Sequence, residues 1–249
     1  MKPDQIIAEM ATIYATCASY RDTGKVVTRF LLAVNHQPHT SVLPFATAFV
    51  RPDRFRFEYR HRYKTMDEWN RYIVWANGSD VKTWWSVCSG VKHPPALGLA
   101  LAGATGVSGG SAHTIPALLI PDKVGGLRLT DFAEVTSLAD EFVGAIPCFR
   151  LSIRFTPPMV DAAEEEQQRA EMTRVTGRPR ERCERGPTTI WIDRATLLIR
   201  RIDKDSRFET FRAESTTEYE PAVGATITDD ELQFGAPELG NASQVTTLA

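Results

Sequence analysis

The spacing of apolar and polar residues along the chain predicts a mainly β protein. Stretches that alternate with a period of two residues, or run apolar with many β-branched and aromatic side chains, are typical of strands with a buried face. They cover residues 25–35, 41–50, 54–60, 71–76, 81–87, 132–138, 148–155, 188–193, 196–202 and 207–218. Turn residues separate them at 51–53, 77–78, 144 and 193–195. We therefore expect neighbouring strands to pair antiparallel in one large sheet.

Two other stretches have the spacing of helices. Residues 3–20 place apolar side chains on one helical face, which we expect to lie against the sheet: Ile6, Ile7, Met10, Ile13, Tyr14 and Cys17. Residues 160–176 read as a polar helix with a Glu165/Arg169 pair, and an arginine-rich segment follows it. Because charges of both signs alternate there, we predict a solvated insertion at about 160–186 rather than a nucleic-acid site.

A third stretch, residues 93–121, contains no Asp, Glu, Lys or Arg. Prolines and glycines divide it, and its apolar piece at 96–107 is shorter than the roughly 20 residues that a membrane-spanning helix needs. We predict two short apolar helices, at about 96–105 and 114–119, joined by a flexible hinge at 107–111.

Composition narrows the function classes. The chain has 249 residues, of which 43% are hydrophobic and 24% charged, as in an ordinary folded protein, and we expect a single domain over 1–249. Its 29 basic and 31 acidic side chains leave a net charge of −2. No long-range field favours nucleic acid or an anionic membrane, so a partner must be bound by shape and apolar contact.

The cysteines and histidines do not have metal-site spacing. Cys17, Cys88, Cys148 and Cys183 form no C-x-x-C pair, and His36 and His39 lie in a polar turn without other ligands, so we expect no metal and no cofactor. Disulfides remain open, with three possible connectivities. The N-terminus has no signal-peptide pattern, so the chain is either cytosolic or a mature form with a new initiating methionine.

Residues 106–110 read GVSGG and fit the G-x-S-x-G pattern of a serine-hydrolase nucleophile at Ser108. That nucleophile follows a strand and precedes its histidine by a long stretch, whereas here a small-residue helix comes first and His113 is the last histidine. We favour a mobile joint made by Gly106, Gly109 and Gly110, with Ser108 and Ser111 capping the next helix. An esterase that uses Ser108 stays as an alternative.

The strand at 54–60 suggests an apolar cavity. Alternation places Phe55, Phe57 and Tyr59 on one face and the charged residues, Arg56 among them, on the other. If the aromatic face is concave, the short apolar helices could fill it or open to admit an apolar ligand. The cavity residues that we predict are Phe49, Phe55, Phe57, Tyr59, Trp75, Leu97, Leu99, Leu101, Val107, Ile115, Leu118, Leu119 and Trp191.

A family resemblance rests on three segments. The run FATAFVRPDRFRFEYR at 45–60 and the hairpin YIVWANGSDVKTWW at 72–85 resemble the periplasmic lipoprotein carriers LolA and LolB and the wider outer-membrane lipoprotein-sorting group. TTIWIDRATLLIR at 188–200 resembles the W-x-D hairpin of that family. The order of elements matches over most of the chain, apart from the charged insertion and the missing signal peptide.

The resemblance implies a mainly β fold, a half-open antiparallel β-barrel of about ten or eleven strands, with helices as a lid over a hydrophobic cavity for acyl chains. In the carrier, the arginine of the Phe-Arg-aromatic segment helps to keep the lid closed, and the matching residue here is Arg56. We therefore expect a lid hinge and gate formed by Arg56, Gly106, Gly109 and Gly110.

The leading hypothesis is a non-enzymatic, monomeric carrier of the bacterial cell envelope that binds a lipid or a lipoprotein acyl chain. Such a carrier is periplasmic or otherwise extracytoplasmic, its leader having been removed, and it works with envelope partner proteins and without nucleic acid. The alternative to it, besides the esterase, is a protein-interaction or envelope-structural module with a filled core.

Overall fold

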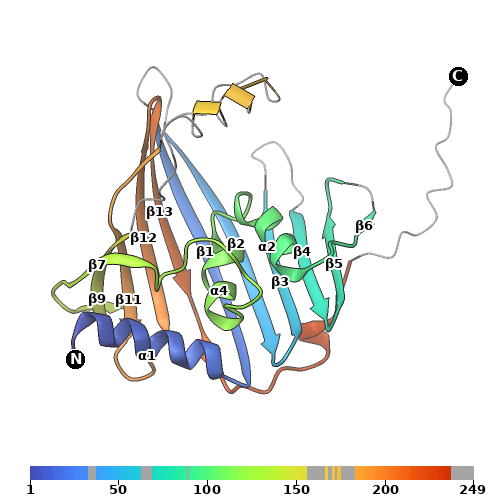
Figure 1. The fold of residues 1–249 in the computed structure, drawn as a ribbon, viewed down its shortest axis with the longest axis horizontal. Coiled ribbons are helices and arrows are strands. Elements are labelled where there is room, and N and C mark those ends of the chain that lie inside the picture. Colours follow the sequence, from blue (N-terminus) through green and yellow to red (C-terminus); the bar gives the residue numbers. More distant parts are fainter. Residues whose placement is uncertain are drawn as a thin grey trace, which may run out of the picture. The chain divides into compact units, whose positions relative to one another are not determined.

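The computed structural model describes residues 1–32, 38–62, 69–88, 90–155 and 183–236, together with short helical stretches at 166–167, 170–171 and 173–174. The predicted mainly β fold is confirmed (Figure 1). Within these residues, fourteen strands form one sheet that is not closed, in the order β6-β5-β4-β3-β2-β1-β13-β12-β11-β9-β7, with β10 beside β12, β14 beside β1 and β8 beside β9. The pairs whose registers are described are antiparallel, as the short turns predicted.

The strands are β1 Ser19–Leu32, β2 His39–Val50, β3 Arg54–His61, β4 Asn70–Asn77, β5 Asp80–Trp85, β6 Val91–Lys92, β7 Phe132–Ser137, β8 Glu141–Val143, β9 Ile146–Phe155, β10 Cys183–Arg185, β11 Thr188–Asp193, β12 Ile199–Phe208, β13 Phe211–Tyr219 and β14 Ala222–Val223. The helices are α1 Pro3–Thr16, α2 Leu97–Thr105, α3 Ser111–Thr114 and α4 Pro116–Leu119, with a 3₁₀ turn η1 at Asp230–Leu232. The four cysteines are unpaired.

Element boundaries differ from the prediction where side chains bind the backbone. The predicted helix at 3–20 ends at Thr16, and the predicted strand at 196–202 begins at Ile199. In the turn before Ile199, Asp193 accepts the Ala195 and Thr196 amides, which holds those residues out of the strand. The predicted strand at 207–218 is two strands, because residues 209–210 turn the chain between β12 and β13.

The predicted insertion at 160–186 lies mostly outside the described residues. Its described pieces at 166–167, 170–171 and 173–174 are helical. Its last part, however, is strand β10, which pairs with β12 in the register Arg185↔Ser206. The insertion is therefore shorter than we predicted, since its C-terminal end belongs to the sheet. Four strands of two or three residues, β6, β8, β10 and β14, have no detectable pattern in the sequence.

The chain divides into two compact units, each described by itself. One unit contains residues 1–13, 25–42 and 127–219, and the other contains residues 14–24, 43–126 and 220–249. In the first unit, Ile190 pairs with Leu151 and with Ile202, and the three side chains form a buried face. The same unit holds most of α1, whose Ile6, Ile7 and Met10 are buried as the helical spacing predicted.

Trp191 lies on the other face of that unit, which corrects its predicted place on the apolar face. It pairs with Arg150 and Arg201, whose guanidinium groups lie 5.3 and 4.6 Å from the centre of its ring. Its Nε1 donates to Glu141 at 3.1 Å. Successive side chains of a strand point to opposite faces, so Trp191 faces away from Ile190 and Ile192. It therefore lies among charged side chains although its strand is mostly apolar.

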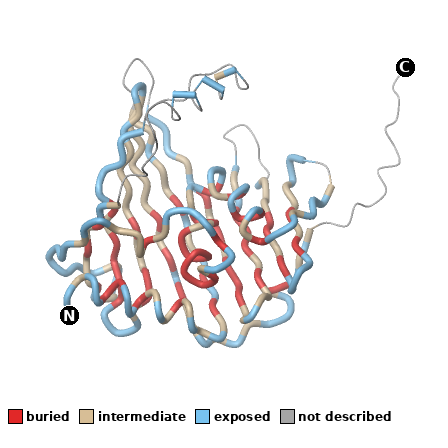
Figure 2. The backbone as a smooth tube through the Cα atoms, viewed as in Figure 1, coloured by how far each residue is buried: buried red, intermediate tan, exposed pale blue. Residues whose placement is uncertain are grey.

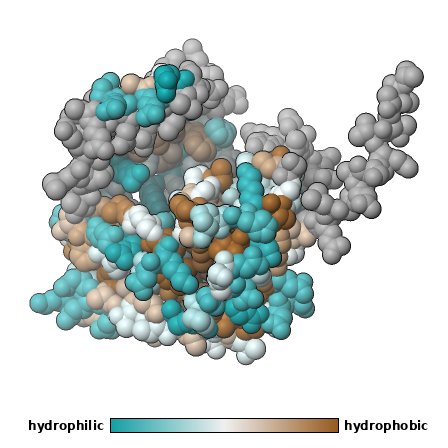
Figure 3. Space-filling model, turned by 45° about the vertical axis from the view of Figure 1, so that its right-hand side comes forward, coloured by the Kyte–Doolittle hydropathy of each residue, from teal (hydrophilic) through white to brown (hydrophobic). Residues whose placement is uncertain are grey.

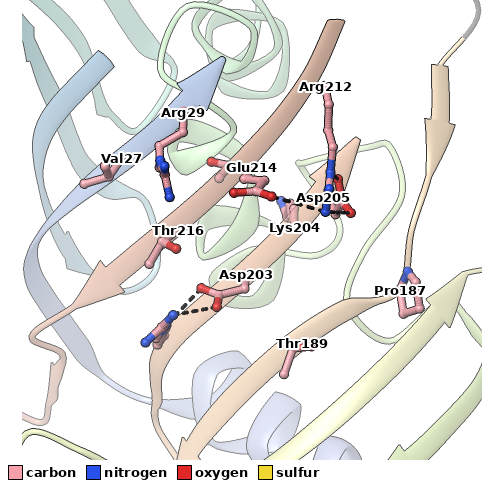
Figure 4. Close-up of a pocket in the computed structure, with 12 residues that line it drawn as sticks. Val27, Arg29, Pro187, Thr189, Asp203, Lys204, Asp205, Arg212, Glu214 and Thr216 are labelled. Atoms are coloured by element: carbon pink, nitrogen blue, oxygen red, sulfur yellow. Dashed lines mark hydrogen bonds and ion pairs between the residues drawn. The ribbon is translucent and has the colours of Figure 1, made fainter. Parts of the chain in front are cut away.

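The charged face continues across β12 and β13 and lines an open pocket of about 370 Å³ (Figure 4). Asp203 accepts both Nε and Nη2 of Arg201, and Asp205 accepts the same two atoms of Arg212. The Asp203 and Asp205 carboxylates that line the pocket are thus each paired with an arginine. Both ion pairs are partly exposed to solvent, so each contributes little to stability.

In the second unit, the predicted alternation along β3 is confirmed. Phe55, Phe57 and Tyr59 are buried on one face, and their partners on β4 are Ala76, Val74 and Tyr72. The Phe45, Thr47 and Phe49 side chains of β2 pair with them from the other side. We call this surface, formed by Phe45, Phe49, Phe55, Phe57, Tyr59 and Tyr72, the aromatic face. Buried positions recur along the strands of the sheet (Figure 2).

Two residues that we assigned to the cavity or its gate lie on the opposite face. Trp75 pairs with Arg56, so both point away from the aromatic face. The Trp75 Nε1 donates to the Leu232 carbonyl at 2.6 Å, and its ring contacts that of Phe234 at 6.0 Å. The C-terminal segment thus covers this side of the sheet. The prediction failed for Trp75 because an apolar residue on the adjacent strand has no fixed face until the register is known.

Arg56 belongs to an ionic cluster centred on Glu58. The Glu58 carboxylate is 4% exposed and accepts hydrogen bonds from Arg56, from Arg60 at 2.8 Å and from Arg71 at 3.0 and 2.9 Å. Burial raises the pKa of Glu58, but the bonds from Arg71, Arg60 and Arg56 outweigh it and lower the pKa to about 2. Glu58 is therefore ionised at neutral pH and binds three guanidinium groups at once.

This cluster predicts a pH dependence of stability. Because the pKa of Glu58 falls from 4.5 in the unfolded chain to about 2 in the folded chain, its stabilisation is fully present above pH 4.5 and is lost as the pH falls toward 2. The shift corresponds to about 3 kcal/mol. We expect Glu58→Gln to lower the free energy of unfolding at neutral pH and to flatten its acid dependence, as measured by urea unfolding across that range. An acid dependence unchanged in Glu58→Gln would contradict this.

Candidate lid and apolar face

Residues 97–120 form a compact helical segment in the second unit, which we call the lid segment. Helix α2 confirms the predicted helix at 96–105. The predicted helix at 114–119 is shorter, since α4 begins at Pro116, and a separate short helix, α3, precedes it. Between α2 and α3, Gly109 and Gly110 have φ values of 65° and 90°, which favour glycine. Gly106 has φ −64° and so continues the helix rather than forming a joint.

The lid segment packs on the aromatic side of the sheet (Figure 1). Helix α2 contacts β4 and β5, and a Cβ placed on Gly103 would lie 3.9 Å from the Tyr72 hydroxyl. Tyr72 is the register partner of Tyr59, so α2 lies over the aromatic face. The lid side chains that are buried in the closed arrangement are Leu97, Leu101, Ile115, Leu118 and Leu119.

Two predicted cavity residues of the lid are exposed. Leu99 is 61% exposed because α2 buries Leu97, Ala100, Leu101 and Ala104, which leaves position 99 on the solvent side. Val107 is 42% exposed, yet it lines a pocket at the edge of the lid. A helix that is apolar all round gives no signal in the sequence for which face is buried, and this explains the error at Leu99.

The edge pocket lies between α2 and the strands β4 and β5, and its volume is about 280 Å³. It is lined by Tyr72, Thr83, Trp84, Trp85, Cys88, Gly90, Lys92, Gly103 and Val107. On the side of the molecule drawn in Figure 3, hydrophobic side chains reach the surface between polar ones. A pocket of this size is near the lower limit for small-molecule sites and suits a short alkyl segment.

One arginine joins the ends of two helices. The Arg51 Nε donates to the Cys17 carbonyl at 3.0 Å, and its Nη2 donates to the Leu119 carbonyl at 3.0 Å and to the Tyr14 carbonyl at 3.4 Å. These carbonyls lie in the last turn of α1, directly after it and at the end of α4, where backbone acceptors lack helical partners and carry partial negative charge. Arg51 thus ties the lid segment to the turn after β2.

Arg51 takes the place that we predicted for Arg56. The sequence showed it only as the first residue of the Arg-Pro turn, and the resemblance directed attention to the arginine of the next strand. Its position in the sequence could have indicated this role. Arg51 directly follows the last residue of β2, and a long side chain at the end of a strand can reach neighbouring elements.

The Ser108 hydroxyl has the geometry of a structural group. It is fully buried, donates to the Thr105 carbonyl at 3.3 Å and accepts the Ala112 amide in the first turn of α3 at 3.1 Å, although the N-cap position itself is Gly110. The Ser111 hydroxyl instead donates to the Ser108 carbonyl. His113 reaches the Gly125 carbonyl with Nε2 at 2.9 Å rather than Ser108. Within the described part of the chain, no three His, Cys, Asp or Glu side chains form a metal-type cluster.

The variant Arg51→Lys tests whether the hydrogen bonds of Arg51 hold the end of α4 in place. The Lys ammonium is a compact charge that cannot bridge carbonyls on both helices, so we expect Arg51→Lys to raise amide hydrogen exchange about tenfold in α4, equivalent to one lost charged hydrogen bond. Exchange is read by mass spectrometry at the Leu119 and Ile120 amides, which bind the Ile115 and Pro116 carbonyls, with Arg54→Lys, an exposed neighbour, as the control. Equal protection of α4 in Arg51→Lys and the wild-type protein would argue against the clamp.

A second test concerns the close packing of the lid segment. A Cβ on Gly98 would lie 2.1 Å from the Lys123 carbonyl oxygen, whereas a Cβ on Gly103 meets only ordinary contact with Tyr72. We therefore expect Gly98→Ala to reduce the free energy of unfolding by about 1–3 kcal/mol, because the backbone must shift. Gly103→Ala is the matched control, measured by thermal and urea unfolding. Equal stability of the two variants would contradict the close approach.

No protein-family model matches the chain, and no curated protein sequence does.

Three solved structures are similar to it over nearly their full length. Lipoprotein LppX of Mycobacterium tuberculosis is 10% identical, with 90% of this chain and 96% of that one covered and a TM-score of 0.42. LprF of Mycobacterium bovis is 11% identical, with 92% and 97% covered and a TM-score of 0.42. A Vibrio parahaemolyticus domain described as outer membrane lipoprotein-sorting is 9% identical, with 92% and 95% covered and a TM-score of 0.37.

Proposed function

We propose that this protein binds an alkyl or acyl chain without covalent chemistry, between the aromatic face and the lid segment, as a lipid or lipoprotein carrier of the bacterial cell envelope. The observation that carries the proposal is the uncharged lid segment packed on a continuous aromatic face. Two hydrophobic surfaces that meet without ion pairs can separate and close again around an apolar guest.

The energetics favour such an exchange. Removing an alkyl chain from water stabilises the complex by roughly 0.8 kcal/mol for each buried methylene group, so one long chain can replace the contacts that the lid gives up. Among the contacts described for the lid segment, the polar link from its α4 end to the strand turn is the Arg51 bond to Leu119. Opening the lid therefore costs mainly apolar contacts, which the guest restores.

In this proposal, the edge pocket is where the guest first enters. Gly103 leaves space against Tyr72, and the exposed Val107 lies at the rim. An alkyl end that fills this pocket touches α2 and the strands together, so it weakens their mutual contact. We assign the predicted cavity residues Phe49, Phe55, Phe57 and Tyr59 to the deeper part of the same site, together with the buried lid side chains named above.

No helix in the described ranges is long and apolar enough to cross a membrane. We place the protein outside the cytoplasm, as a monomer that receives its guest from envelope partners.

A filled-core interaction module is the second candidate, because the buried aromatic side chains and Leu101 leave the face closed. Native mass spectrometry of the purified protein, followed by organic extraction, separates the two. A carrier takes up added lauroyl glycerol as a defined mass increment. A protein that stays at its apo mass under the same conditions is the interaction module.

Filling the edge pocket should weaken binding. Gly103→Phe places a ring against Tyr72, and we expect it to raise the Kd for lauroyl glycerol by about tenfold, since it displaces a buried alkyl segment. The matched control is Leu99→Phe on the exposed side of the same helix. Binding is measured by the change in tryptophan fluorescence, because Trp84 and Trp85 line the pocket. Identical affinity in both variants would exclude the edge pocket from the site.

A further inference from the structure

A buried carboxylate lies on the same side of the sheet as the aromatic face. Asp22 of β1 is 2% exposed, and its Oδ2 accepts the Tyr20 hydroxyl at 2.6 Å. Thr47 of the neighbouring β2 is close enough for its hydroxyl and amide to favour the ionised form. Because Thr47 is the register partner of Phe57, this group of three residues belongs to the aromatic side.

One oxygen of this carboxylate is without a partner. Asp22 Oδ1 is buried, and among the described residues no donor meets it at hydrogen-bond distance and angle. The Thr47 hydroxyl and amide lie near the carboxylate without meeting that geometry. A buried acceptor left unpaired is costly, and most such groups in folded proteins are paired. The three arginines that bind Glu58 are on the opposite face of the sheet, so they do not neutralise Asp22.

Burial also changes the protonation of Asp22. Desolvation raises its pKa from 3.8 to about 6, while the hydrogen bond from Tyr20 and the nearby hydroxyl and amide of Thr47 lower it. The side chain therefore carries a negative charge at neutral pH in an apolar environment. Apolar binding sites commonly hold a few polar groups that fix the orientation of the ligand.

We infer that Asp22 Oδ1 is the acceptor for the head group of the bound chain, and that the site selects guests whose head group donates a hydrogen bond. This inference rests on the proposed function and deepens it. A hydroxyl, amide or ammonium head group supplies the missing donor. A free carboxylate head group brings a second negative charge next to Asp22, with little solvent between them.

The preference follows from electrostatics at low effective dielectric constant. Repulsion between two carboxylates is larger inside a protein than in water, and a charged hydrogen bond is stronger there. The ligand class is therefore a neutral acylglycerol or another chain with a donating head group, in preference to a free fatty acid. The Tyr20 hydroxyl stays bound to Oδ2, so it orients the carboxylate and leaves Oδ1 for the ligand.

The experiment compares three guests with the same alkyl chain: lauroyl glycerol, laurylamine and laurate. Binding to the full chain is measured by tryptophan fluorescence and calorimetry at about pH 8, above the pKa of Asp22 of about 6. We expect laurate to bind at least about tenfold more weakly than lauroyl glycerol, the worth of one charged hydrogen bond. In Asp22→Asn, which keeps the shape and loses the charge, the gap should shrink to less than about threefold.

Asp80→Asn is the matched control, because it removes an exposed carboxylate of the same unit and should leave the preference unchanged. Equal affinity of the wild-type protein for all three guests overturns the inference alone, as does a preference that persists in Asp22→Asn. Failure of every guest to bind the wild-type protein overturns the proposed function as well. Unfolding measurements on Asp22→Asn confirm that the variant is folded, and Tyr20→Phe, which keeps the carboxylate, should retain the preference.

Discussion

The two-residue alternation of strand β3 is the constraint on which the rest of the second unit depends. It sends Phe55 and Phe57 to one side of the sheet and Glu58 to the other. Each side then needs a different cover, because aromatic rings require apolar neighbours and a buried carboxylate requires cations. The uncharged lid segment supplies the first, while the arginines around Glu58 and the C-terminal segment supply the second. One strand thus separates the proposed binding side from a side that only stabilises the fold.

Polar groups on the aromatic side are few, and each has a defined position. Arg51 binds carbonyls at helix ends, Ser108 caps a helix within the lid, and Asp22 holds one oxygen unpaired. The hydrogen bonds described for the first two are made to other groups of the protein. Asp22 differs because its environment raises its energy in the absence of a guest, which is the arrangement expected of a group that has a partner only part of the time.

Much of the fold follows from local patterns in the sequence. Alternating strands, glycine turns and the apolar helix at α2 depend on neighbouring residues, and these predictions are confirmed. The orientation of Trp75 and Trp191 depends on strand register, which is set by residues far away in the sequence, and it was predicted wrongly. The hydrogen bond from Arg51 to Leu119 and the approach of Thr47 to Asp22 join segments that are distant in the sequence. No periodicity encodes such contacts, so only the assembled sheet reveals them.

The lid segment is folded on itself as well as on the sheet. Gly98 at its start lies against the Lys123 carbonyl just beyond its end, and His113 in its middle reaches the Gly125 carbonyl. These internal contacts do not involve the sheet. Under the proposed function, the segment is therefore expected to move as one rigid piece whose two ends stay together, and a guest larger than the edge pocket changes its angle to the sheet rather than its internal structure.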